Sequence, residues 1–525
     1  MKNKKKDSAK TKSEKRQSGK AKGCQDFSCI IAKFLGEAWL VGGALRDALL
    51  GKKSGDLDIV LSPCTDFKKK VIKLASALKS SAFEMDAENS VWRITGPKTA
   101  PFQLDIMPFQ GKSLEDDILR RDFTVNALAI KLSEKCKILY SSDDNLFEIK
   151  FSREDIVDLC GGIRDIEGRK IKIVSDKAFQ EDPLRMLRAY RIAAQHDMRI
   201  CTHTVSIIKR DSKKISQSAG ERICEELMKL LCRDDSCKWI KKIHEAGLLF
   251  ESLPELKPQP LCAQEYYGKG GVLRHTFNVL DRTDVFFARM SDFCPHHEDI
   301  KKHLSAYQPG LYKFAALMHD IAKPAKAAFI NGRLRFFGHE ECGAIMSAQI
   351  MERLHFSKDE IRLVSAVIGS HLRPGSLAVN ETISQKAMFR LFRAMGNAVL
   401  PLLVLCWADY ASYITPARLE KFRPELSKLP QTEDISKLPY NSPKKTLRFM
   451  QAIYYIAGTY IKKAAELHGK SFADGHDVID ILKIQPGPQV GQVLEQMRMM
   501  QFEGKINSRE EAILWLKTIA KEKNI

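Results

Sequence analysis

The sequence lacks the features that mark secreted and membrane proteins. Its thirteen cysteines include no CxxC pair, and no apolar segment follows the basic start of the chain. An odd, unpatterned cysteine count without an export signal indicates reduced thiols, so we expect a cytoplasmic protein. No apolar run reaches the roughly 20 residues that a membrane helix needs, so we expect no membrane association. Aromatic residues make up only 8% of the chain, which does not suggest a long all-β architecture.

The chain has an excess of positive charge. Its 525 residues are enough for two or three domains, and Lys+Arg 85 against Asp+Glu 65 gives a net charge of +20. Residues 1–22 hold ten Lys or Arg against Asp7 and Glu14 and almost no apolar residue, so we expect residues 1–23 to be a disordered basic tail. The remainder is basic too, which favours a polyanionic partner.

Hydrophobic patterns divide the chain into two halves. AWLVGGALRDALLG predicts a strand, a glycine turn and a helix; DLDIVLS, VWRIT and FQLDIMPF predict strands, and residues 66–80 a helix. From about Asp182 onward the pattern is mostly helical. Composition shifts place domain boundaries near residues 24, 160, 265 and 440.

Two aspartates separated by one residue are the sharpest local signal. On the expected strand Asp56 and Asp58 point to the same face, about 7 Å apart at the backbone, and can bridge hard cations such as Mg²⁺. Two such ions can polarise an attacking hydroxyl and neutralise a leaving pyrophosphate. Alone, a DxD pattern more often marks a solvated strand face.

The residues upstream of this pair favour a metal site over a solvated strand face. Gly42 and Gly43 directly follow an apolar segment, and Arg46 lies on the first turn of the expected helix. Glycines there let backbone amides approach a triphosphate, with a helix N-terminus behind them. A tight turn alone would explain the two glycines, and a surface charge alone would explain Arg46. The combination of the glycines, Arg46 and the DxD pattern within 20 residues favours a nucleotide-binding site.

Five segments, in order, resemble the motifs of class II tRNA nucleotidyltransferases and their bacterial poly(A) polymerase relatives. The signature is VGGALRDALLGKKSGDLDIVL. The other four are similar to a ribose-recognising motif (RRDFTVNALAI), a flexible hinge (DLCGGIRDIEG), a base-reading helix (EDPLRMLRAYRIAA) and a neck-stabilising helix (AGERICEELMKLL). Together they cover about residues 38–232.

The resemblance implies an α+β protein whose head, a mixed sheet with helices, precedes an all-helical remainder. It implies that Asp56 and Asp58 bind catalytic Mg²⁺, whereas Asp105 is either a third catalytic carboxylate or an ordinary strand acid. The residues implied to bind the nucleotide in the head are Gly42, Gly43, Arg46, Arg121, Asp122 and Asn126. The residues implied for base reading are Asp182 and Arg185, with Arg188 and Arg191 alongside.

Residue chemistry supports base reading independently. A carboxylate accepts from an exocyclic amine and an arginine donates to a ring nitrogen, so Asp182 with Arg185 could read cytosine or adenine and reject uracil and guanine. Asp182 also suits the N-cap of a helix that starts at Pro183. We favour base reading over capping alone.

The second half carries a separate set of metal-ligand residue types. Histidine and aspartate together suit Mn, Fe, Ni or Mg, and adjacent His319 and Asp320 on a helix could approach one ion. The string HDIAKP resembles the HD phosphohydrolase superfamily. By that resemblance, the ligands are His275, His319, Asp320, His339, His371 and Asp409, holding Ni²⁺ or Mn²⁺. Structural packing of these residues is the competing interpretation.

These observations predict an enzyme that adds CMP and AMP from CTP and ATP to the 3′ end of tRNA. The expected domains are a head (24–160), a neck that reads bases and binds RNA (161–265), an HD domain (266–440) and a C-terminal helical region (441–525). The alternatives are a poly(A) polymerase, a CC-only or A-only enzyme, an HD phosphohydrolase with an RNA-binding head, and a non-enzymatic RNA-binding protein. The basic-basic-Phe segment of the polymerases is not found after DxD. The sequence does not indicate an oligomeric state.

Overall fold

The computed structural model describes residues 24–379, 382–426, 444–468 and 471–522. The predicted basic tail (1–23) and the predicted boundary near residue 440 lie outside these ranges. The chain forms two compact units. The first ends at Ala178 but also includes Asp197–Thr204; the second comprises Phe179–His196 and the chain from Val205 onward.

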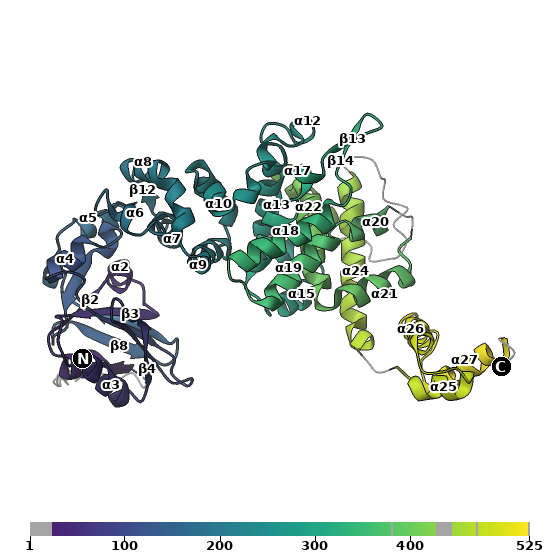
Figure 1. Ribbon diagram of the computed structural model, residues 1–525, viewed down its shortest axis with the longest axis horizontal. Coiled ribbons are helices and arrows are strands. Elements are labelled where there is room, and N and C mark those ends of the chain that lie inside the picture. Colours follow the sequence, from purple (N-terminus) through teal and green to yellow (C-terminus); the bar gives the residue numbers. More distant parts are fainter. Residues whose placement is uncertain (1–23, 380–381, 427–443, 469–470, 523–525) are drawn as a thin grey trace, which may run out of the picture. The chain divides into compact units, whose positions relative to one another are not determined.

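The first unit is built on a mixed seven-stranded sheet (Figure 1). Its strands in spatial order are β10 (Ile156–Asp158), β7 (Leu128–Lys131), β2 (Ala38–Val41), β3 (Asp56–Leu61), β6 (Gln103–Pro108), β5 (Val91–Thr95) and β4 (Ser81–Asp86). Only β3 and β6 pair in parallel; the other neighbours are antiparallel. The expected strands of the head, β2, β3, β5 and β6, are therefore confirmed as neighbours or near neighbours in one sheet.

Helices and a smaller sheet complete this unit. The smaller sheet has the order β1 (Cys24–Asp26), β8 (Lys137–Ser141) and β9 (Leu146–Lys150). The helices are α1 (Ser28–Leu35), α2 (Gly43–Leu49), α3 (Phe67–Ala77), α4 (Leu114–Leu119) and α5 (Gly162–Glu167). Parallel pairing of β11 (Lys170–Ile171) with β12 (Arg199–Ile200) joins Asp197–Thr204 to this unit. Buried strand residues such as Leu40, Ile59 and Leu104 are fully inaccessible, so β2, β3 and β6 form the rigid centre of the head.

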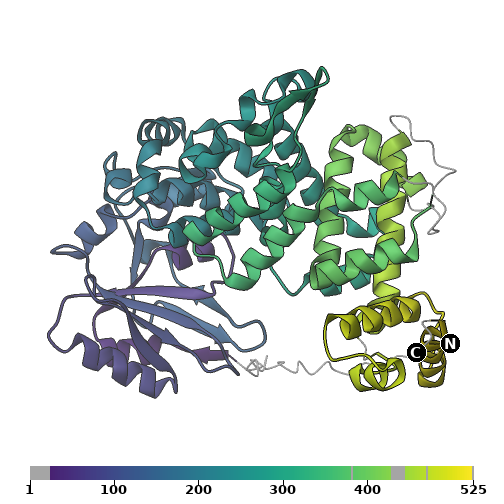
Figure 2. The same ribbon diagram turned by 45° about the vertical axis from the view of Figure 1, so that its right-hand side comes forward.

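The second unit is almost entirely helical, as the sequence predicts. Its first helices are α6 (Ala178–Glu181, beginning at the last residue of the first unit), α7 (Arg185–His196), α8 (Thr202–Asp211, which begins in the first unit), α9 (Gly220–Leu231), α10 (Ser236–Glu245), α11 (Leu248–Ser252) and α12 (Gln264–Tyr267). The next are α13 (Gly271–Ala288), α14 (Met290–Phe293), α15 (His297–Leu304), α16 (Pro309–Met318), α17 (Lys323–Lys326), α18 (His339–Arg353), α19 (Lys358–Ser370), α20 (Arg373–Ala378), α21 (Gln385–Met395), α22 (Val399–Ser412), α23 (Pro416–Leu426) and α24 (Lys444–His468). A short hairpin, β13 (Ala328–Ile330) and β14 (Arg333–Arg335), precedes α18. In Figure 2 these helices run in colour from blue-teal at α6 to yellow-green at α24.

One helical stretch, Gln385–Ser412, is long and apolar enough to cross a membrane by length and composition alone. Most of it is buried in the protein: 78% of its apolar window is covered by other residues. A helix break at Gly396–Ala398 divides it into α21 and α22, and α22 packs against α13 and α24. The stretch is therefore best described as core helices of the second unit.

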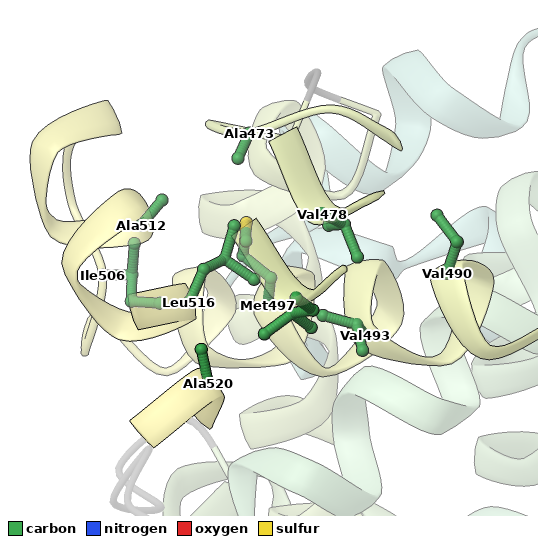
Figure 3. Close-up of a cluster of buried hydrophobic side chains, with 10 residues drawn as sticks. Ala473, Val478, Val490, Val493, Met497, Ile506, Ala512, Leu516 and Ala520 are labelled. Carbon is green, nitrogen blue, oxygen red and sulfur yellow. The ribbon is translucent and has the colours of Figure 1, made fainter. Parts of the chain in front are cut away.

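The last three helices have a hydrophobic cluster of their own. Helices α25 (Gly475–Leu482), α26 (Pro488–Phe502) and α27 (Arg509–Glu522) point apolar side chains toward one another (Figure 3). Val478, Met497 and Leu516 are fully buried there, one from each helix. The region is held to the preceding helices by Phe502, which contacts the rings of Phe389 and Phe392.

Candidate active sites

Strand register brings the predicted carboxylates of the head onto one face. Asp58 pairs with Val41 of β2 on one side and with Asp105 of β6 on the other. Because β3 and β6 are parallel and in register, Asp58 and Asp105 point to the same side of the sheet. Asp56 lies two residues before Asp58 and is exposed, whereas Asp58 is half-buried. The strand thus presents the carboxylate pair at its N-terminal end.

Asp105 has a partner that the sequence analysis did not identify. Arg93 of β5 donates to both of its carboxylate oxygens, from Nε and Nη2, each at 2.8 Å. The hydrogen bonds to Asp105 raise the pKa of Arg93, and the charges of Asp56 and Asp58 raise it further despite partial burial. All three carboxylates therefore act on one guanidinium, which balances their mutual repulsion.

Gly42 lies next to Asp58 of β3 and next to Arg121 of the motif that resembles the ribose-recognising segment. Its φ of 77° is in the region that favours glycine. A Cβ at this position would come within 3.1 Å of both Asp58 Oδ2 and Arg121 Nη1. Arg121 is oriented by Asp117, whose Oδ2 accepts from Nη2 at 2.8 Å. Gly42, Asp58 and Arg121 consequently form one compact corner of the head.

Arg46 is buried, and so it is not a surface charge. It is 6% exposed and its Nη1 donates to Asn126 Oδ1 at 2.7 Å. Asn126 Nδ2 in turn donates to Asp122 Oδ1 at 2.9 Å. A neighbouring carboxylate, Asp47, accepts from Arg46 Nε, and burial raises the pKa of Asp47 although Arg46 opposes this. These hydrogen bonds attach helix α2 to the motif that resembles the ribose-recognising segment. Gly43 lies against the Arg46 guanidinium.

The segment that resembles a hinge is packed against the same motif. Thr124 Oγ1 donates to Asp165 Oδ2 at 2.7 Å, and both residues are buried. Asp158 accepts from the backbone N–H groups of Gly162 and Ile163 at the start of α5. A Cβ on Gly162 would lie 2.1 Å from the Thr124 carbonyl oxygen, so only glycine allows this approach.

The predicted start of the base-reading helix is wrong by about two residues. Helix α7 begins at Arg185, not at Pro183, because the Asp182 carboxylate accepts from the Leu184 N–H in a turn before the helix. Arg222 of α9 holds the same carboxylate, with Nη2 2.9 Å from Oδ2. Arg185 lies 3.5 Å from Glu181. Asp182 is thus positioned by α9.

The remaining arginines of α7 share a second acid on α9. Glu226 is 2% exposed and accepts from Arg191 Nε at 2.6 Å. Arg188 Nη1 lies 3.9 Å from its other oxygen. Buried charges require such pairing, so Arg188 and Arg191 attach α7 to α9 as well as forming a basic face.

Five helices of the second unit bring all six predicted HD residues together. His275 is on α13, His339 begins α18 and Asp409 is on α22. His319 and His371 lie at the C-terminal ends of α16 and α19. The expectation that Asp320 lies on a helix is wrong, since α16 ends at Met318 and Asp320 is in the following turn.

These six residues divide into two triads with metal-ligand spacing. One triad is His275, His319 and Asp409; the other is Asp320, His339 and His371. Within each, the ligand atoms lie within 4.8 Å of one another. Asp320 faces both: its Oδ2 is 3.1 Å from His319 Nε2, and its Oδ1 is 3.4 Å from His339 Nε2. The arrangement suits two cations joined by one carboxylate.

Hydrogen bonds turn the same nitrogen of each histidine toward this centre. Nδ1 of His319, His339 and His371 lies 2.7–2.8 Å from a backbone carbonyl oxygen three residues earlier. His275 Nδ1 lies 3.3 Å from Ser412 Oγ. A carbonyl oxygen can only accept, so Nδ1 carries the proton in these three rings and Nε2 keeps its lone pair for a metal.

Burial and charge set the protonation of the centre. Burial lowers the pKa of His371 to about 4, so it is neutral at pH 7. Burial alone would raise the pKa of Asp320, but His319 and Lys323 hold it well below its usual value. Lys323 Nζ lies 2.6 Å from Asp320 Oδ2. Burial would lower the pKa of His319, but the Asp320 charge raises it, so a bound cation would have to displace that proton. Imidazole nitrogens together with carboxylate oxygens suit transition metals such as Mn²⁺ or Ni²⁺.

Several residues of these sites escaped the sequence analysis. They are Asp47, Arg93, Asp117, Arg222, Glu226 and Lys323. Two spacings could have found some of them. Asp117 and Arg121 are four apart, as are Arg222 and Glu226, which is the interval of neighbours on one helical face. Arg93 had no local signal, because its contact with Asp105 depends on strand pairing.

Fold and sites together define a nucleotidyltransferase head followed by a helical half with an HD-type centre. Residues 38–172 match the family model of the Poly A polymerase head domain. Residues 197–259 match that of the probable RNA and SrmB-binding site of polymerase A, and residues 273–414 match the HD domain. The chain therefore carries a Poly A polymerase head domain, an RNA-binding region and an HD domain in the order that its motifs predict.

Curated relatives match nearly the whole chain. The A-adding tRNA nucleotidyltransferase of Deinococcus radiodurans is 26% identical over 92% of this chain and 96% of its own length. The CC-adding tRNA nucleotidyltransferase of Geobacter sulfurreducens is 28% identical over 91% of each. Among solved structures, a CCA-adding enzyme with CTP has a TM-score of 0.54 at 18% identity, covering 94% of this chain and 98% of its own. The Thermotoga maritima CCA-adding enzyme complexed with tRNA has a TM-score of 0.52 at 16% identity, with 94% and 99% covered; these likenesses establish the fold.

Proposed function

We propose that this protein adds CMP and AMP from CTP and ATP to the 3′ end of tRNA, in the cytoplasm. The observation that carries the proposal is the corner formed by Gly42, Asp58 and Arg121, next to the buried network of Arg46, Asn126 and Asp122. This corner brings together carboxylate, glycine and guanidinium groups, which are the kinds of group that bind a triphosphate and a ribose, and so supports the proposal. Relatives that act on tRNA and match over nearly their full length support the choice of substrate.

In this proposal each group has a separate task. Mg²⁺ held by Asp56 and Asp58 would neutralise charge on the triphosphate and activate the 3′ hydroxyl. Arg121, fixed by Asp117, contacts phosphate oxygens, and Asp122 with Asn126 holds the ribose. Asp105, held by Arg93, supports the same face as a third carboxylate. Asp182 and Arg185 present a carboxylate and a guanidinium to the base, while the positive charge of the chain binds the tRNA backbone.

The alternative within this class is a partial enzyme that adds only CC or only the final A. It is favoured by one finding: the relatives matched over nine-tenths of both chains include A-adding and CC-adding enzymes.

One assay distinguishes full addition from partial addition. tRNA lacking CCA, tRNA ending in C and tRNA ending in CC are each incubated with CTP, ATP or both, and the products are sequenced. Extension of all three to CCA supports full addition. Products that stop at CC, or extension of the CC-ended tRNA alone, would identify a partial enzyme, and long A tails a poly(A) polymerase.

Changing the base-reading pair is expected to relax nucleotide choice more than it slows transfer. Asp182→Asn removes one charge and an acceptor, and Arg185→Ala removes the donor, so cytosine and adenine lose their complementary partners. We expect the preference for CTP and ATP over UTP and GTP, measured as kcat/KM ratios, to fall by about tenfold or more. The exposed Arg199→Ala is the matched control and should leave the ratios unchanged. Complete exclusion of UTP and GTP by both variants would contradict the proposal.

We further propose that the HD centre is a second active site, which hydrolyses phosphoesters. Asp320 belongs to one triad of ligand atoms and faces the other, and Nδ1 hydrogen bonds orient three of the histidines; structural packing alone does not require this. Apolar residues would fill a core at a lower desolvation cost. A suitable substrate is a 2′,3′-cyclic phosphate or a phosphate on a damaged RNA end, because it must be removed before a 3′ hydroxyl can accept CMP.

A further inference from the structure

Exposed tyrosines border the HD centre. Tyr413 directly follows α22, which carries Asp409, and is 49% exposed. Its ring centroid lies 5.3 Å from that of His275. Tyr266 of α12 is 70% exposed and meets the edge of Tyr267 at 4.7 Å. Tyr267 in turn stacks on His275 at 4.7 Å. Two partly exposed tyrosines therefore lie within one or two ring contacts of a metal ligand.

A lysine side chain lies between Tyr267 and the candidate metal ligand Asp320. Lys323 Nζ is 2.8 Å from Tyr267 Oη, 2.6 Å from Asp320 Oδ2 and 5.2 Å from the centroid of the Tyr267 ring. A buried ammonium beside metal ligands attracts a phosphate.

We propose that Tyr413 and Tyr266 form an aromatic rim that stacks the nucleobase of the substrate whose phosphate occupies the HD centre. The inference rests on the proposed hydrolase function and specifies its substrate class: nucleotides and single-stranded RNA ends, and not phosphoesters without a base. Exposed aromatic rings cost free energy in water unless a ligand covers them. Proteins that bind single-stranded nucleic acid without sequence preference use such rings to stack bases. Exposed Arg333, Arg335 and Arg373, near the ligands His339 and His371 in sequence, add positive charge suited to a polynucleotide.

The test compares substrates with and without a base. With Mn²⁺ or Ni²⁺ present, Tyr413→Ala and Tyr266→Ala should raise KM for a 2′,3′-cyclic mononucleotide about tenfold and leave kcat within about twofold. Tyr413→Phe should restore KM, because the ring remains. KM for glycerol cyclic phosphate, which has no base, should not change. Phe83→Ala, an exposed aromatic on β4 of the head, is the matched control. Metal content of each variant is measured to confirm that the centre is intact.

A second readout does not depend on hydrolysis. A 2-aminopurine nucleotide is titrated into metal-free protein, and stacking is followed as fluorescence quenching. The head is identical in both proteins, so quenching lost in Tyr413→Ala reports the rim. If wild type hydrolyses nothing but shows this difference, the rim stands and the hydrolase function fails. The rim is overturned if hydrolysis occurs while KM and quenching are unchanged in the alanine variants, if both substrates lose affinity equally, or if the rings bind only a protein.

Discussion

Asp58→Asn is expected to reduce nucleotide addition by at least about a hundredfold while tRNA binding stays nearly unchanged. The substitution keeps the shape of a side chain that lies beside Gly42 and in register with Asp105, but removes the charge that would hold Mg²⁺. Asp56→Asn should have the same effect for the same reason. Single-turnover addition to tRNA lacking CCA measures the first quantity, and a filter-binding titration measures the second.

Asp86→Asn provides the matched control, because Asp86 is an aspartate on β4 of the same sheet. Its addition rate should remain at the wild-type level. Raising the Mg²⁺ concentration should restore little of the activity of Asp58→Asn, since the neutral amide oxygen cannot supply the lost negative charge. Addition by either active-site variant at more than about a hundredth of the wild-type rate would contradict the two-metal assignment.

Loss of the shared carboxylate of the HD centre is expected to abolish phosphoester hydrolysis and spare nucleotide addition. Asp320→Asn removes the charge that faces both triads and that balances Lys323, so both cations lose a ligand. We expect hydrolysis of a cyclic-phosphate dinucleotide to fall by at least about a hundredfold, and bound Mn²⁺ or Ni²⁺ to fall with it. Chelation of wild type should have the same effect, reversed by adding metal back.

The reciprocal experiment makes the two sites separable. Asp58→Asn should keep full hydrolysis, and Asp320→Asn should keep full addition to tRNA. Asp480→Asn, at an exposed aspartate on α25, is the control for loss of a carboxylate in the second unit. The second active site is ruled out if wild type hydrolyses no phosphoester across Mn²⁺, Ni²⁺, Mg²⁺ and Fe²⁺. A variant that loses both activities together, with a lower melting temperature, would assign Asp320 to stability.

The sequence was sufficient wherever chemistry depends on residues close together in the chain. Asp56 and Asp58 share a face because strands repeat every two residues, and Gly42 permits a positive φ beside them. The order of five motifs predicted the family, and the helical second half followed from hydrophobic period. There were two exceptions. Asp320 lies in the turn after α16 and not on a helix. Helix α7 starts later than expected because the Asp182 carboxylate accepts from the Leu184 N–H and pairs with Arg222 in place of capping a longer helix.

Tertiary structure alone decided how distant residues pair. Nothing in the sequence links Arg93 to Asp105 or Arg191 to Glu226, because these contacts depend on strand register and on the crossing of α7 and α9. The six HD residues could be named from the sequence, but their division into two triads around Asp320 could not. That division depends on where five helices end and how they pack, and packing is determined by the side chains of the whole core. Sequence thus indicated most of the groups that are candidates for the chemistry, and the fold determined which of them contact one another.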